Sequence, residues 1–153
     1  MNYIDMQIAT SAPHPELEQF QRWVDAALAI FEDGADCELV IRLVDDAESA
    51  QLNQQYRHKT GPTNILSFPF EAPAGMNIDL LGDLVICAPL IAQEAAQQNK
   101  LPEHHWIHIT VHGVLHLLGY DHIEDQDAEQ MEALEIEILS KLGIANPYME
   151  DGK

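Results

Sequence analysis

The pattern of apolar and polar positions along the chain predicts four strands and five helices. Short apolar or alternating runs are typical of strands, and they occupy residues 3–9, 37–45, 65–71 and 80–88. Longer segments with helical spacing or helix start signals occupy residues 15–33, 46–57, 89–100, 102–119 and 125–143. The elements do not strictly alternate, and the last two strands are spaced like a hairpin. We therefore predict an α+β fold, with a mixed, mostly four-stranded sheet packed against helices.

The short helix predicted at residues 46–57 follows a strand directly. Asp45 and Glu48 fit a start that resembles a capping box, in which two side chains satisfy the first backbone N–H groups of a helix. Helical spacing predicts that one face of this helix presents Ala47, Ala50 and Tyr56.

The helix predicted at residues 102–119 is apolar on nearly all sides, so we expect it to be a buried central helix. His108, His112 and His116 nevertheless follow one another at four-residue spacing along one stripe of this helix. Buried polar side chains need partners, so this stripe requires an explanation.

The motif "HGVLHLLGYDH" at residues 112–122 predicts a metal site at the C-terminal end of this helix. His112 and His116 lie one turn apart, where two imidazoles reach the same ion. Gly119 allows the chain to leave the helix, and the following turn brings His122 back toward the same point. Three imidazoles with an open fourth position are typical of catalytic zinc, although nickel or another divalent ion also fits.

Simpler interpretations exist for individual histidines. A lone buried histidine usually forms a hydrogen bond to a carbonyl group, and two histidines at this spacing occur on helices by chance. We interpret His108 as a core histidine, with an indirect role at the metal or a fourth ligand position as alternatives. Four others are expected on the surface or in loops, namely His14, His58, His104 and His105.

Gly113 stands where zinc proteases of the H-E-x-x-H-x-x-G-x-x-H type carry a catalytic glutamate. That glutamate moves a proton from the metal-bound water to the leaving amine, and peptide cleavage is slow without it. A phosphodiester instead needs stabilisation of negative charge on its oxygens, which cations supply. The sequence therefore favours phosphodiester cleavage over peptide cleavage.

The chain has 153 residues, 46% of them hydrophobic, and shows no linker or internal repeat, so residues 1–153 are predicted to form a single domain. It lacks a run of about 18 apolar residues and a signal-like N-terminus, so we expect a cytoplasmic protein with no membrane partner. Cys37 and Cys87 lie in apolar runs and are expected to be buried thiols.

The net charge of −19 argues against nucleic acid as a partner, because such a chain repels polyanions. Only Arg57 and Lys59 lie close together among the seven Lys and Arg residues. RNA binding would therefore require cations focused in one cleft near the metal, or partners that present the RNA, and we favour the second explanation.

Three stretches together resemble the bacterial rRNA maturation factor family YbeY. "HGVLHLLGYDH" resembles its histidine signature, and "LLGDLVIC" at residues 80–87 resembles its "LGDIVI" strand. "YRHKTGPTNILSFPFE" at residues 56–71 resembles the segment before and including "TDVLSFP", with Asn64 where aspartate is usual. The resemblance extends over residues 36–142.

The resemblance implies a zinc-dependent endoribonuclease specific for single-stranded RNA. It implies roles in processing ribosomal RNA, especially the 3′ end of 16S rRNA, and in ribosome quality control. The family's metal ligands correspond to His112, His116 and His122, and its essential arginine corresponds to Arg57. Ribosomal proteins or a ribosome-associated GTPase are the expected partners.

The roles of the residues around these positions remain open at this stage. Arg57 either contacts a phosphate or only neutralises a helix C-terminus, and Lys59 is a tentative substrate contact or a solvated loop residue. Three more residues are candidates to line the site or orient a ligand, namely Ser67, Asp83 and Asp121. A metallopeptidase or other zinc hydrolase, and a non-catalytic ribosome-assembly factor with a structural zinc, are the alternative functions.

Overall fold

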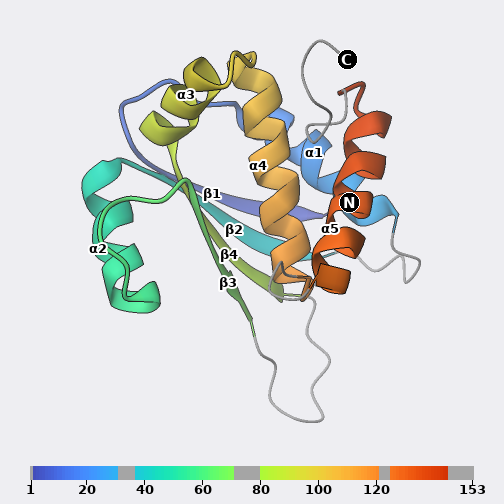
Figure 1. Cartoon of the computed structure of the whole chain (residues 1–153), viewed down its shortest axis with the longest axis horizontal. Coiled ribbons are helices and arrows are strands. Elements are labelled where there is room, and N and C mark those ends of the chain that lie inside the picture. The colour runs from blue at the N-terminus through green and yellow to red at the C-terminus, as the bar shows by residue number, and fades with distance from the viewer. Residues whose placement is uncertain (1, 31–36, 71–79, 121–124, 145–153) are drawn as a thin grey trace.

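The computed structural model describes residues 2–30, 37–70, 80–120 and 125–144. They form an α+β fold with a mixed four-stranded sheet, which confirms the predicted fold class (Figure 1). In chain order, the elements are β1 (Tyr3–Ala9), α1 (Leu17–Ala29), β2 (Glu38–Val44), α2 (Asp46–Arg57), β3 (Ile65–Pro69), β4 (Leu80–Cys87), α3 (Ala88–Gln97), α4 (Pro102–Leu117) and α5 (Asp125–Lys141).

The strand order across the sheet is β1-β2-β4-β3. β1, β2 and β4 are parallel, with α1 as the crossover between the first two, whereas β3 pairs antiparallel with β4. β1 is therefore one edge strand, and β3 forms the opposite edge. Every helix in the described part of the chain is too short or too polar to cross a lipid bilayer.

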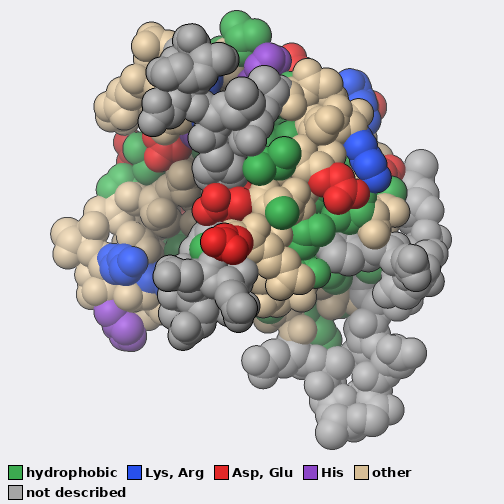
Figure 2. All heavy atoms as spheres, turned by 45° about the vertical axis from the view of Figure 1, so that its right-hand side comes forward, with side chains coloured by type: hydrophobic (Ala, Val, Ile, Leu, Met, Phe, Trp, Pro, Cys, Tyr) green, Lys and Arg blue, Asp and Glu red, His purple; other side chains and the backbone are tan. Residues whose placement is uncertain are grey.

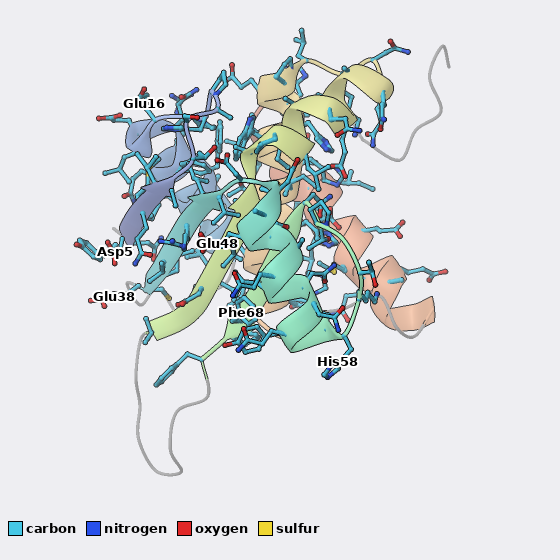
Figure 3. All side chains as sticks on the ribbon, turned by 90° about the vertical axis from the view of Figure 1, so that its left-hand side faces the viewer. Asp5, Glu16, Glu38, Glu48, His58 and Phe68 are labelled. Carbon is cyan, nitrogen blue, oxygen red and sulfur yellow. The ribbon has the colours of Figure 1, made fainter. Side chains whose placement is uncertain are left out.

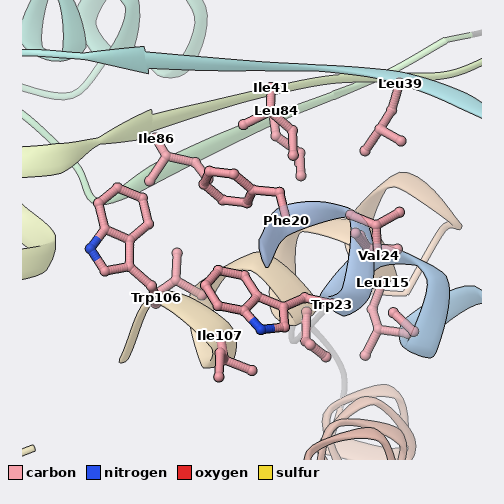
Figure 4. Packing of buried hydrophobic residues seen from close by; sticks show 14 of the residues in the cluster. Phe20, Trp23, Val24, Leu39, Ile41, Leu84, Ile86, Trp106, Ile107 and Leu115 are labelled. Carbon is pink, nitrogen blue, oxygen red and sulfur yellow. The ribbon is translucent and has the colours of Figure 1, made fainter. Parts of the chain in front are cut away.

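Alternating residues of the strands build two separate cores on the two faces of the sheet. Leu39, Ile41 and Leu43 of β2 face α1, α4 and α5 and belong to the larger core. In this core the ring of Phe20 meets the rings of Trp23 of α1 and Trp106 of α4 edge to face, with centroids 5.4 and 6.0 Å apart (Figure 4). A smaller core on the opposite face, under α2, contains Val44, Leu66, Val85 and Cys87.

The prediction for the face and start of α2 was wrong. Its buried residues are Ser49 and Asn53, whereas Ala47 and Tyr56 are exposed. The Ser49 hydroxyl donates to the carbonyl of Thr63, and the Asn53 amide donates to the carbonyl of Gly61, so both side chains hold the following loop.

The start of α2 also lacks the predicted capping box. Glu48 accepts two hydrogen bonds from the Arg42 guanidinium of β2, at 2.6 and 3.1 Å. Asp45 accepts a hydrogen bond from the Thr10 hydroxyl. Neither carboxylate caps the helix, because each has a partner in another element. Local helix signals did not show these contacts.

α4 lies across the face of the sheet that the larger core covers, and most of its residues are buried, as the sequence predicted. It approaches the sheet closely at Gly113. A Cβ atom on this glycine would lie 2.5 Å from Cδ1 of Ile65 in β3 and 2.9 Å from Cδ2 of Leu84 in β4. Side chains of the sheet therefore fill the space that a glutamate side chain at this position would need.

Candidate metal centre and its cleft

The C-terminal half of α4 brings His112 and His116 together. Their rings are half-buried, their centroids are 4.5 Å apart, and their Nε2 atoms are 3.0 Å apart. Two nitrogen ligands of a tetrahedral zinc ion, each about 2.0–2.1 Å from it, lie about 3.3 Å apart. The pair therefore fits the requirement for two ligands of such an ion.

The third predicted ligand, His122, and its neighbour Asp121 lie outside the described residues. Among the residues that are described, no group of three histidine, cysteine or acidic side chains is arranged to hold a metal ion. The metal site with three histidine ligands thus stays a prediction, for which the paired imidazoles of α4 supply two of the three groups.

Glu135 of α5 holds the histidine stripe from behind. Its side chain is fully buried, and it accepts hydrogen bonds from Nε2 of His108 at 2.9 Å and from Nδ1 of His112 at 3.3 Å. Because Nδ1 of His112 donates to this carboxylate, Nε2 retains its lone pair for a metal ion. Histidine ligands are commonly oriented by a carboxylate in this way.

The same hydrogen bonds keep Glu135 ionised. Burial by itself raises the pKa of this carboxyl group, but the hydrogen bonds and charges of His108 and His112 outweigh burial and lower its pKa to about 2. The Glu135 carboxylate therefore carries its negative charge at neutral pH.

Sequence analysis missed Glu135, although a signal was present. The residue lies four positions after Met131 and three before Ile138, so it occupies the buried stripe of α5. An acidic residue on an apolar stripe indicates a buried polar contact. His108 contacts Glu135, so the structure favours the indirect role over that of a plain core histidine.

His105 was expected at the surface, and that prediction was wrong. Its side chain is only 4% exposed, and its Nε2 lies 2.8 Å from Glu94 of α3. Burial lowers the pKa of His105, against the opposing effect of Glu94. Glu94 also accepts hydrogen bonds from the amide of Asn64 at 3.1 and 3.4 Å. An aspartate at position 64 would place two carboxylates together, so the asparagine suits this environment.

A cleft of about 650 Å³ opens beside the two α4 histidines. The described residues that line it come from the end of α2, the following loop, β3, α4 and the turn after α4, and they are Arg57, Lys59, Asn64, Ile65, Leu66, Ser67, Pro69, His112, His116, Gly119 and Tyr120. Four of the five predicted site residues therefore share one cleft. Its described lining includes two cations and no carboxylate, although the chain as a whole carries a charge of −19.

Arg57 reaches this cleft from the last turn of α2, which ends at His58 in a left-handed conformation (Figure 3). Its Nη2 donates to the carbonyl of Ser67 at 2.9 Å. Asn64 and Phe70, which flank β3, form backbone hydrogen bonds with β4, so by antiparallel alternation the backbone groups of Ser67 point to the free edge. Arg57 is thus anchored on the outer edge of the sheet.

Two further candidates from the sequence have different outcomes. Ser67 lines the cleft, as predicted. Asp83 does not line it, because it pairs with Phe68 in the sheet and lies on the α2 side, away from α4. Burial and the nearby Asp5 carboxylate raise the pKa of Asp83. The alternation of side chains along β4 explains the error, since Leu84 takes the face toward α4.

Comparisons with known proteins identify the family of this fold. A family model described as endoribonuclease YbeY matches residues 5–143. The chain belongs to the YbeY family. A curated relative from Colwellia psychrerythraea, named endoribonuclease YbeY, is 56% identical over 150 residues, which cover 96% of this chain and 97% of the relative.

A solved structure supports the same fold across the chain. The solution structure of TM1509 from Thermotoga maritima superposes with a TM-score of 0.60 at 26% sequence identity. The match covers 98% of this chain and 99% of that one. The likeness in fold therefore extends over nearly the whole chain.

Proposed function

We propose that this chain is a metal-dependent endoribonuclease that cleaves single-stranded RNA. Its physiological substrate is then ribosomal RNA, with the 3′ end of 16S rRNA as the processing site and a further role in ribosome quality control. Family membership and the name of the 56% identical relative support the nuclease activity. The observation that carries the proposal is the shared cleft, which is lined by the paired imidazoles of α4 together with Arg57 and Lys59.

The chemistry divides between a metal ion and the side chains of the cleft. His112, His116 and His122 would hold zinc, or another divalent ion, which would supply a Lewis acid for a phosphoryl oxygen. Arg57 uses one Nη group on the Ser67 carbonyl, and its other N–H groups are available for a phosphate. Glu135 orients His112 through Nδ1 and keeps its Nε2 directed into the cleft.

Two features of the site disfavour a metallopeptidase. Ile65 and Leu84 fill the space where the catalytic glutamate of such an enzyme would begin. In addition, Arg57 occupies the outward carbonyl of Ser67, which a peptide lying along the edge of β3 would need for a ladder hydrogen bond.

The cations in the cleft support local RNA binding, but they are few. Two cations neutralise few phosphates, so we propose that ribosomal proteins or a ribosome-associated GTPase in the cytoplasm present the RNA. Acidic side chains lie near the middle of one face of the molecule and basic ones toward its rim (Figure 2).

The test is cleavage of a labelled single-stranded RNA that ends in the 3′ sequence of small-subunit rRNA. Wild type, His116→Ala and Arg57→Ala are compared, with Arg22→Ala of α1 as the matched arginine outside the cleft. We expect Arg57→Ala to lower kcat/KM by about 10²–10³-fold, as loss of one donor to a transition-state anion does. His116→Ala and chelation should abolish cleavage, and zinc added after chelation should restore each protein except His116→Ala to its own earlier rate.

Circular dichroism and thermal unfolding establish that each variant is folded. Equal cleavage by wild type, His116→Ala and Arg57→Ala would contradict the proposal and indicate a contaminating nuclease. Loss of folding in His116→Ala, without any cleavage by wild type, would instead support an assembly factor with a structural zinc. Peptide cleavage by the wild type would support the metallopeptidase alternative.

A further inference from the structure

An aromatic cluster lies beside the cleft, at the C-terminal end of α2. The Tyr56 ring is 50% exposed and meets the Phe68 ring of β3 edge to face, with centroids 5.1 Å apart and an interplanar angle of 71°. Phe68 lies at the same end of α2 as His58 (Figure 3). Phe70, two residues further along and therefore directed to the same side as Phe68, is 41% exposed. Among the described residues, the third largely exposed aromatic is Tyr3, on the opposite edge strand.

The cluster has a fixed arrangement. Phe68 packs against the smaller core under α2, so it provides a rigid support for the Tyr56 ring. The Ser49 and Asn53 hydrogen bonds attach the loop after α2 to this helix. An exposed aromatic ring that is held in this way needs little ordering when a flat ligand stacks on it.

Arg57 connects the cluster to the cleft. Its guanidinium carbon lies 5.6 Å from the centre of the Phe68 ring, while the same side chain lines the cleft beside His112 and His116. An RNA strand whose phosphate contacts Arg57 at this edge lies between the histidines on one side of β3 and the exposed ring of Tyr56 on the other. The aromatic pair lies on the α2 side of β3 and the cleft on the α4 side, with Arg57 between them at the edge of the strand.

We propose that Tyr56, supported by Phe68, is a stacking subsite for a nucleobase next to the phosphate that Arg57 contacts. This inference rests on the proposed function and assigns a new contact to the RNA. Base stacking requires no positive charge, and exposed aromatic rings are the usual platforms for unpaired bases. Stacking therefore supplies affinity that two cations alone do not provide in a chain with a net charge of −19. It also selects single strands, because bases in a duplex are already stacked on each other.

Direct binding tests this subsite independently of cleavage. Fluorescence anisotropy measures the Kd of a short labelled single-stranded RNA for zinc-loaded wild type, Tyr56→Ala, Tyr56→Phe and Tyr3→Ala, within a time in which gels show no cleavage. We expect Tyr56→Ala to raise Kd by about five- to hundredfold, as loss of one stacked base does. Tyr56→Phe keeps the ring and should bind like wild type, and so should the matched control Tyr3→Ala.

A second RNA, in which the bases are replaced by abasic sites, separates stacking from an indirect effect on Arg57. Wild type should bind the abasic RNA as weakly as Tyr56→Ala binds the normal RNA. On the abasic RNA, Tyr56→Ala should bind no more weakly than wild type. An equal loss on normal and abasic RNA would overturn the proposal, as would unchanged binding of normal RNA by Tyr56→Ala. If wild type binds RNA through Tyr56 but never cleaves it, the subsite stands and the nuclease function fails.

Discussion

Glu135 is fully buried between two histidines of another helix, and its carboxylate determines which nitrogen of His112 is available. A neutral imidazole has one N–H and one lone pair, so a hydrogen bond at Nδ1 leaves the lone pair at Nε2. The Nε2 atom of His112 then faces that of His116. A single carboxylate, distant in sequence, thus prepares the predicted metal site.

We predict that Glu135→Gln weakens zinc binding by about 10–100-fold, the usual effect of losing a carboxylate partner of a histidine ligand. Competition with a chromogenic chelator measures the affinity. Glu137→Gln on the exposed side of the same helix is the matched control, since its side chain is 55% exposed and forms an ion pair with Lys141. Unchanged zinc affinity in folded Glu135→Gln would show that His112 needs no such partner.

Arg57 illustrates how one residue satisfies two interpretations. It lies in the last turn of α2, where a cation interacts favourably with the helix dipole, and it also lines the cleft. The hydrogen bond to the Ser67 carbonyl explains how Arg57 can lie at the end of α2 and also line the cleft, because it directs the side chain across the edge of β3. Sequence could offer these roles only as alternatives.

At the scale of elements, the packing of α4 on the sheet depends on Gly113. The glycine allows the helix backbone to approach Ile65 of β3 and Leu84 of β4. Close approach places the histidine stripe of α4 beside the free edge of β3. The same glycine that indicated a non-protease mechanism from sequence therefore also has a packing role.

We predict that Gly113→Ala lowers the free energy of unfolding by only about 1–2 kcal/mol. Two flexible side-chain ends must move, but alanine favours the helix by about 1 kcal/mol. Gly113→Glu should cost about 3 kcal/mol or more, because a carboxylate is forced into an apolar contact.

Urea unfolding measures both variants of Gly113. Ala133→Glu, at an exposed position of α5, is the control for adding a glutamate to a helix, and we expect a change within about 0.5 kcal/mol. Gly113→Glu as stable as wild type would mean that the sheet does not exclude a side chain here.

At the scale of the whole molecule, charge is distributed unevenly. A net charge of −19 opposes the approach of RNA, whereas the described lining of the cleft contains Arg57 and Lys59 without a carboxylate. The structure thus supports the focused-cation explanation, while presentation of the RNA by partners stays a prediction. Both explanations limit RNA contact to a short segment near the histidines.

We predict a weak salt dependence of RNA binding. Each phosphate neutralised on a single strand contributes about −0.7 to the slope of log K against log salt, so two cations give about −1.4. Lys59→Gln should reduce the magnitude of the slope by about 0.7, and Tyr56→Ala should leave it unchanged. Anisotropy titrations at several salt concentrations measure these slopes, and a much steeper slope in wild type would reveal further cationic contacts.

The sequence by itself determined the order and type of the elements. Burying one face of a helix or strand requires apolar residues at the period of that element, and this pattern is visible locally in the sequence. It also determined the spacing of His112 and His116, since two residues four apart on one helix face the same way. It did not determine the face of α2, where hydrogen bonds from Ser49 and Asn53 to the next loop replaced apolar contacts.

Only the tertiary structure decided which distant side chains meet. Arg57 lines the same cleft as the histidines because β3 folds back antiparallel on β4 and presents the Ser67 carbonyl at its free edge. Glu135 reaches them because α5 packs against α4. Such contacts depend on how the connections between elements place whole helices and strands beside one another, which the local hydrophobic pattern does not indicate. The physical reason is that periodicity specifies which face of an element is buried but not which neighbour buries it.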